Sequence, residues 1–132
     1  MNTPETGLVI VTHGQIGQSM IEVAEFILDQ SLSSLRFISY QQADKPEIDH
    51  AKIRQMIANM DTGQGVLVMT DLGGASPCNQ VSELIKDQHL AVVTGLNLAM
   101  LLRVWNYRSK PLNQLARLAT EGAIRDVKEF HP

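Results

Sequence analysis

The chain alternates short apolar runs with segments whose apolar residues recur at helical spacing, and this alternation limits the fold to one class. Most of the runs lack an apolar–polar alternation, which is typical of strands buried on both faces. The predicted strands are Gly7–Thr12, Leu35–Tyr40, Gly65–Thr70 and Leu90–Thr94. Strands separated by helices at a spacing of roughly 25–30 residues form βαβ units. We therefore predict an α/β fold, with a doubly wound, mainly parallel central sheet and helices on both of its faces.

Five apolar stripes predict the helices of this fold. The first has the spacing i, i+3, i+4, i+7, i+8 of an inward-facing helical stripe, and its members are Met20, Val23, Ala24, Ile27 and Leu28. The other stripes are Ile53–Met60, Val81–Ile85, Leu98–Trp105 and Leu112–Ala119. Proline is favoured in a first helical turn, and it marks three of the helix starts, at Pro46–Glu47, Ser76–Pro77 and Pro111.

Length and composition exclude several classes of protein. With 132 residues, 44% of them apolar and 19% charged, the sequence predicts one globular domain, 1–132. A net charge of −3 without a lysine- or arginine-dense segment argues against binding to nucleic acid or to an anionic membrane. No apolar run approaches the about 18 residues of a membrane span, and the start MNTPETG lacks the features of a signal peptide. The single cysteine, Cys78, allows no disulfide framework, so we expect a cytoplasmic protein with no direct membrane insertion.

Polar side chains follow the two most apolar strands, at the point where each strand ends. The first strand runs into His13, and the third runs into Asp71. Ligands of open α/β sheets bind at the carboxyl ends of the strands, where the strand order reverses. If the two strands are neighbours, Asp71 can accept a hydrogen bond from one ring nitrogen of His13. The other ring nitrogen then keeps its lone pair free for a nucleophilic or basic role.

The loop after Asp71 has the features of an anion site. Leu72, Gly73 and Gly74 supply backbone N–H groups, and the two glycines permit a close approach. Ser76 is placed to cap a helix that begins at Pro77, and the N-terminus of a helix attracts anions such as phosphate. Each of these residues alone also fits a simple turn or cap. The combination at two strand ends favours phosphoryl transfer through a phosphohistidine.

The sequence lacks the residues that other kinds of phosphate or metal site require. The sequence contains no GxxxxGK[ST] phosphate loop and no HExxH zinc motif, and we expect no metal or organic cofactor. Leu84 stands where a cysteine phosphatase built on Cys78 needs arginine. Thr12 stands where a phosphoglycerate-mutase-like enzyme has arginine, and a response-regulator receiver needs paired acids after its first strand. The remaining histidines lie in polar surroundings, and we predict no role for them in the site; they are His50, His89 and His131.

The chain resembles the mannose-type IIA domain of the bacterial sugar phosphotransferase system over essentially its whole length. The matching segments are VIVTHGQIGQSMIEVAEFIL, VLVMTDLGGASPCNQVSELI and VVTGLNLAMLLRV. The resemblance implies that His13 accepts a phosphoryl group from HPr and passes it to a IIB acceptor. It also implies that Asp71 hydrogen-bonds His13 and that Ser76 helps to hold the phosphate. The chain departs from the family pattern at Leu72, Gly73 and Ala99, which bears on the shape of the phosphate loop and on partner choice.

The resemblance also bears on the C-terminal segment and on the biological role. From the residues alone, Ala123–Phe130 fits a helix or a last strand, and Gly122 indicates a break before it. The family forms homodimers that exchange a C-terminal strand, which implies that this segment is a swapped edge strand. Two roles are compatible with the same site. One is a phosphoryl carrier for sugar uptake, and the other is a regulatory phosphohistidine module without sugar transport.

Overall fold

A parallel sheet lies at the centre of this computed structural model, which describes residues 5–40, 46–72 and 89–132. Its strands are β1 (Gly7–His13), β2 (Leu35–Tyr40), β3 (Val66–Thr70) and β4 (Leu90–Val93). All described pairings are parallel, and the strand order is β2-β1-β3-β4. The predicted α/β class with a parallel central sheet is therefore confirmed. Three of the four strands begin or end one residue away from their predicted bounds.

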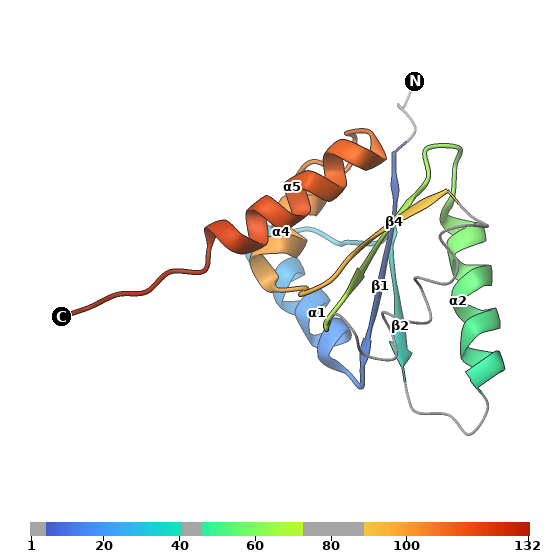
Figure 1. The fold of residues 1–132 in the computed structure, drawn as a ribbon, viewed down its shortest axis with the longest axis horizontal. Coiled ribbons are helices and arrows are strands. Elements are labelled where there is room, and N and C mark those ends of the chain that lie inside the picture. Colours follow the sequence, from blue (N-terminus) through green and yellow to red (C-terminus); the bar gives the residue numbers. More distant parts are fainter. Residues whose placement is uncertain (1–4, 41–45, 73–88) are drawn as a thin grey trace.

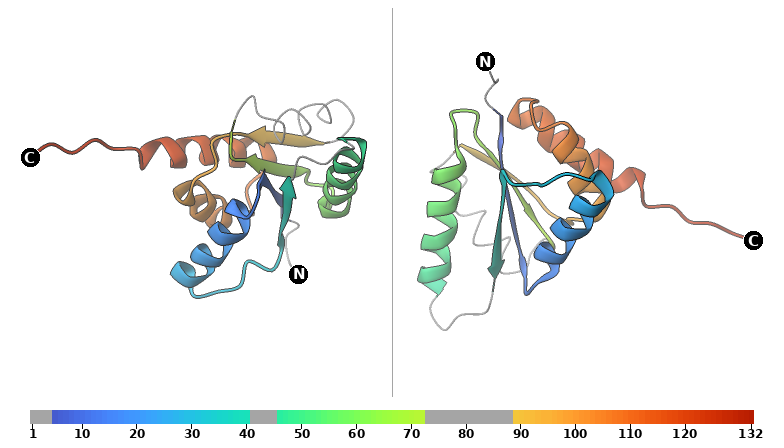
Figure 2. Two further views of the ribbon diagram at one scale, coloured as in Figure 1. Left: turned by 90° about the horizontal axis from the view of Figure 1, so that it is seen from below. Right: turned by 180° about the vertical axis from the view of Figure 1, so that it is seen from behind.

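Helices cover both faces of the sheet, as predicted (Figures 1 and 2). The described helices are α1 (Ile16–Leu28), α2 (Pro46–Met60), α4 (Leu98–Asn106) and α5 (Leu112–Arg125). Helices α1, α4 and α5 lie on one face, and α2 lies alone on the other among the described helices. The helix predicted after Ser76–Pro77 falls outside the described residues. Each helix within residues 5–40, 46–72 and 89–132 is too short or too polar to be a membrane span.

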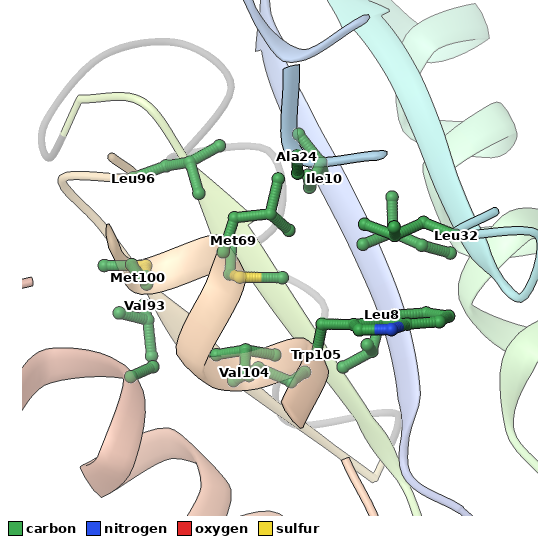
Figure 3. Close-up of a cluster of buried hydrophobic side chains, with 14 of the residues drawn as sticks. Leu8, Ile10, Ala24, Leu32, Met69, Val93, Leu96, Met100, Val104 and Trp105 are labelled. Atoms are coloured by element: carbon green, nitrogen blue, oxygen red, sulfur yellow. The ribbon is translucent and has the colours of Figure 1, made fainter. Parts of the chain in front are cut away.

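Both faces of the central strands are buried, which explains their unbroken apolar runs. On one face, strand residues such as Leu8, Ile10 and Met69 pack against Met100 and Val104 of α4 (Figure 3). On the other face, alternate strand residues pack against α2, and this second cluster includes Val9, Val11, Val66, Val68, Ile53 and Ile57. Because successive side chains of a strand point to opposite faces of the sheet, the strands contribute to two separate hydrophobic cores.

Helix α1 packs closely against the sheet at Gly17. Its buried face consists of Gly17, Ile21 and Ala24. Val23 and Ile27 are 46% and 51% exposed, so their predicted inward position was wrong. The helix carries apolar residues on more than one face, and the close approach at Gly17 decides which of these faces meets the sheet.

The Gly17→Ala substitution is expected to lower the free energy of unfolding by about 1–3 kcal/mol, although alanine is the better helix former. A Cβ at this position would lie 2.6 Å from Cε2 of Phe37 and 2.8 Å from Cγ2 of Ile10. Urea denaturation measures the change, and Ser19→Ala on the exposed side of α1 is the control that should cost nothing. A Gly17→Ala protein as stable as the wild type would contradict the close packing.

The C-terminal segment is only partly a helix. Helix α5 continues through Ala123 to Arg125, so the predicted break at Gly122 and the strand start at Ala123 were wrong. Gly122 instead packs against the side chain of Arg103, where a Cβ would overlap it. After Arg125 the chain leaves the body of the molecule (Figures 1 and 2), and Phe130 is 85% exposed.

Candidate functional site

The carboxyl ends of β1 and β3 meet at the centre of the sheet. Strand β1 pairs with β2 on one side and with β3 on the other, so the strand order reverses between β1 and β3. This is the position where open α/β sheets bind ligands. His13 is the last residue of β1, and Asp71 follows directly after β3. The expectation that these two strands are neighbours in the sheet is confirmed.

His13 and Asp71 are joined by two hydrogen bonds to one carboxylate oxygen. The backbone N–H of His13 donates to Oδ2 of Asp71 at 3.0 Å, and Nδ1 of the ring lies 2.9 Å from the same oxygen. Because a carboxylate only accepts, this contact places the ring proton on Nδ1. The lone pair of the neutral ring is then on Nε2, and the His13 side chain is 41% exposed.

The environment of Asp71 favours its ionised form. Burial by itself raises the pKa of this carboxyl, because it removes water from the charge. The pKa is lowered by hydrogen bonds from the backbone and the ring of His13, by the charge of that ring and by the N–H of Leu72. Together these effects outweigh the effect of burial. The pKa of Asp71 therefore lies below its ordinary value, and the carboxylate persists at neutral pH.

The lowered pKa of Asp71 predicts a pH-dependent contribution to stability. A carboxylate with a lowered pKa stabilises the fold fully above its unfolded-state pKa of about 4, and loses this contribution as the pH falls through the folded-state value. We expect the free energy of unfolding to fall more steeply in the wild type than in Asp71→Asn between about pH 5 and pH 2. Urea denaturation across this range measures both slopes, and equal slopes would contradict the prediction.

Strand β2 forms a further side of the site, which was not predicted from the sequence. Tyr40, the last residue of β2, is the register partner of His13, and its ring stands at 75° to the His13 ring with 6.0 Å between centroids. The hydroxyl of Ser39 donates to the carbonyl of Gly14 at 2.7 Å. The signal was present, because the rule that placed Asp71 at this edge of the sheet also places the end of β2 there.

The start of helix α1 depends on the residue before His13. Gln15 at the N-cap makes no side-chain cap, and the hydroxyl of Thr12 accepts from the N–H of Gly17 at 3.0 Å instead. Thr12 is fully buried, so this bond has no competing water. This hydrogen bond joins Thr12, just before His13, to the first turn of α1, just after it, so the chain is held on both sides of His13.

The predicted phosphate loop is described only at its first residue. Leu72 is 59% exposed, and its N–H donates to Oδ1 of Asp71 at 3.0 Å. Gly73, Gly74 and Ser76 lie outside the described residues. Ala99 lies in the first turn of α4, which the side chain of Asn97 caps by accepting from the N–H of Met100. Within the described ranges, no three His, Cys, Asp or Glu side chains gather as metal ligands.

Solved structures share this fold across almost the whole chain. A mannose/sorbose-specific IIA subunit of the phosphotransferase system from Enterococcus faecalis superposes with a TM-score of 0.85 at 24% identity, covering 98% of this chain and 97% of that one. A PTS IIA protein associated with the fucose utilization operon of Streptococcus pneumoniae has a TM-score of 0.82 at 20% identity, covering 98% and 96%. At these identities the likeness shows the fold alone.

Sequence comparison gives the family. The chain is 30% identical over 124 residues to the mannose-specific EIIAB component of the PTS system from Escherichia coli (strain K12), covering 92% of this chain. It spans 38% of the length of that relative. The family model described as PTS system fructose IIA component matches residues 7–118, which include His13 and Asp71. This chain therefore belongs to the family of PTS system IIA components of the mannose type.

Proposed function

We propose that this protein carries a phosphoryl group on Nε2 of His13, from HPr to a IIB acceptor of a sugar phosphotransferase system. The observation that carries the proposal is the contact between Nδ1 of His13 and the Asp71 carboxylate, which leaves Nε2 with the lone pair. Membership of the IIA family supports a phosphoryl-transfer role. The partial exposure of the His13 side chain makes it reachable for a second protein.

The chemistry is an in-line transfer between two imidazoles. Nε2 of His13 attacks the phosphorus of the donor phosphohistidine, a new P–N bond forms, and the donor P–N bond breaks with its electron pair returning to the donor ring. The His13 ring keeps its Nδ1 proton and gains positive charge, which the Asp71 carboxylate stabilises at 2.9 Å. Such a step needs mainly positioning and charge stabilisation. In this proposal, Gly73, Gly74 and Ser76 hold the phosphoryl oxygens, whereas the N–H of Leu72, predicted to share this role, donates to Oδ1 of Asp71 in the structure. The reverse chemistry loads the acceptor.

Exposed apolar residues beside the site favour a protein as the reaction partner. Helix α1 begins three residues after His13, and it exposes Ile16 and Val23 on one surface. A groove of about 600 Å³, lined mainly by apolar atoms, runs between α1 and Leu98 at the start of α4. Apolar surface of this kind is typical of protein interaction sites. We assign it to the docking of the phosphoryl donor.

The C-terminal tail supports a homodimer. Val127 and Phe130 are 76% and 85% exposed on a segment that leaves the body of the molecule, and β4 ends the described strand order. A second copy can cover these side chains and pair with the edge of β4 that no described strand occupies. Removal of residues 126–132 is then expected to convert a dimer into a monomer in analytical ultracentrifugation. A dimer of unchanged affinity after this removal would contradict the role of the tail.

The test of the carrier function is phosphorylation by the general components of the system. The protein is incubated with Enzyme I, HPr and labelled phosphoenolpyruvate, and the product is analysed by ³¹P NMR. We expect an acid-labile, base-stable label whose signal is that of histidine phosphorylated on Nε2. A base-labile acyl phosphate on Asp71, or no label at all, would overturn the proposal.

A further inference from the structure

Strand β2 bounds the His13 site on the side away from Asp71. Because β1 lies between β2 and β3, the end of β2 and the residue after β3 flank His13 from opposite sides. Tyr40 is the register partner of His13. It is only 8% exposed and belongs to the buried cluster against α2, so its ring has little freedom to move.

The Tyr40 ring contacts the His13 ring in a favourable geometry. The centroids are 6.0 Å apart and the planes are nearly perpendicular, at 75°. Aromatic rings in proteins prefer this edge-to-face arrangement at centroid separations of about 4.5–7 Å. The hydrogen bond to Asp71 holds one edge of the imidazole through Nδ1. The ring of Tyr40 restricts tilting of the imidazole on the opposite side.

The last two residues of β2 also fix the backbone turn after His13. The hydroxyl of Ser39 donates to the carbonyl of Gly14 at 2.7 Å, and the N–H of Gly14 donates to the carbonyl of Tyr40 at 3.4 Å. Gly14 has a φ of +50°, in the left-handed region, and no Cβ that would restrict it. Both of its backbone polar groups are therefore held by β2, which keeps the Cα of His13 in place.

We propose that Ser39 and Tyr40 are positioning residues that set the direction of Nε2 of His13. Asp71 fixes the tautomer and one edge of the ring, Tyr40 fixes its tilt, and Ser39 fixes the adjoining turn. Phosphoryl transfer depends on alignment of the attacking nitrogen with the phosphorus, and small misplacements slow such reactions strongly. The inference rests on the proposed carrier function and adds the residues that orient the accepting nitrogen.

The first experiment compares Tyr40→Leu with Tyr40→Phe in phosphorylation by HPr. Leucine removes the ring but remains apolar, and the maximal rate is expected to fall about 3- to 10-fold with an unchanged KM for HPr. Phenylalanine keeps the ring, and its rate should remain within about 2-fold of the wild type. Equal losses in the two variants would overturn the role of the ring.

The second experiment tests the turn at Gly14. Ser39→Ala removes the hydroxyl that donates to Gly14, and the maximal rate is expected to fall about 2- to 10-fold. Ser34→Ala, at an exposed position just before β2, is the matched control and should keep the wild-type rate. A wild-type rate in Ser39→Ala would overturn the part of the proposal that concerns Ser39.

A third measurement separates positioning from stability and from the carrier function itself. In the unphosphorylated protein, NMR follows the exchange of the His13 Nδ1 proton with water, which should be faster in Tyr40→Leu than in the wild type. Ile57→Val loosens the same buried cluster and should leave this exchange unchanged. Failure of the wild type to accept phosphate would refute the carrier function, while the proton exchange still tests the positioning. Unchanged exchange together with an unchanged maximal rate in Tyr40→Leu would overturn the inference.

Discussion

His13→Gln is expected to abolish phosphoryl acceptance from HPr, with the initial rate falling by about 10³-fold or more. Glutamine is polar and similar in reach, and its amide can still donate to Oδ2 of Asp71, where Nδ1 of His13 lies at 2.9 Å. An amide nitrogen has no available lone pair, so no P–N bond can form. The measurement is the initial rate of label transfer, with the free energy of unfolding determined in parallel to show that the fold is retained.

His89→Gln is the matched control for this substitution. The carbonyl of His89 accepts from the N–H of Val66, the first residue of β3, so His89 lies at the opposite end of the sheet from His13. The histidine-to-glutamine change there should leave the rate of phosphoryl acceptance at the wild-type level. Label retained in His13→Gln, or lost equally in both variants, would contradict His13 as the acceptor.

Asp71→Asn should lower the rate of phosphoryl acceptance by about 10²- to 10⁴-fold, the upper end being the loss that follows the same substitution in a Ser-His-Asp triad. The substitution removes the negative charge that stabilises the ring as it becomes phosphorylated. It also allows the amide NH₂ to donate to Nδ1, which moves the ring proton to Nε2 and blocks the attacking nitrogen. The ¹⁵N chemical shifts of the His13 ring report this change of tautomer directly.

The control for Asp71→Asn is Asp61→Asn. Asp61 also accepts backbone hydrogen bonds, from the N–H groups of Gly63 and Gly65 at 2.8 and 3.0 Å, and it precedes β3 instead of following it. Its substitution affects a loop of the same kind without touching His13, so the rate should be unchanged. A wild-type rate and an Nδ1–H tautomer in Asp71→Asn would reduce Asp71 to a structural residue at a strand end.

The sequence was sufficient for the strands and for the central pair of the candidate site. Strands that bury both faces appear as continuous apolar runs, so Val9, Val11 and Val68 could be assigned without knowledge of the contacts. The pairing of β1 with β3 brought His13 and Asp71 together, because parallel strands end at the same edge of a sheet.

The parts that could not be predicted depend on packing rather than on periodicity. Helix α1 is apolar on several faces, and the choice of the Ile21 and Ala24 face depends on the close approach that Gly17 permits. Glycine in a sequence pattern predicts a helix break at Gly122, whereas in the structure this glycine leaves room for the side chain of Arg103. The end of β2 could be placed at this edge of the sheet from the parallel arrangement alone. The contact of the Tyr40 ring with the His13 ring depends in addition on the register of β1 and β2, which no local pattern in the sequence specifies.

The shared acceptor oxygen of Asp71 has a consequence for the reversibility of the proposed carrier. The backbone N–H and the ring Nδ1 of His13 both donate to Oδ2 of Asp71. These two hydrogen bonds close a small ring of atoms, which restricts rotation about the side-chain torsions of His13. The rotational entropy of the imidazole is thus largely lost when the protein folds, before any partner arrives. Because the phosphorylated ring of the proposed carrier keeps its Nδ1 proton on Asp71, both loading and unloading proceed without a search for the ring orientation, which lowers the entropic part of both barriers.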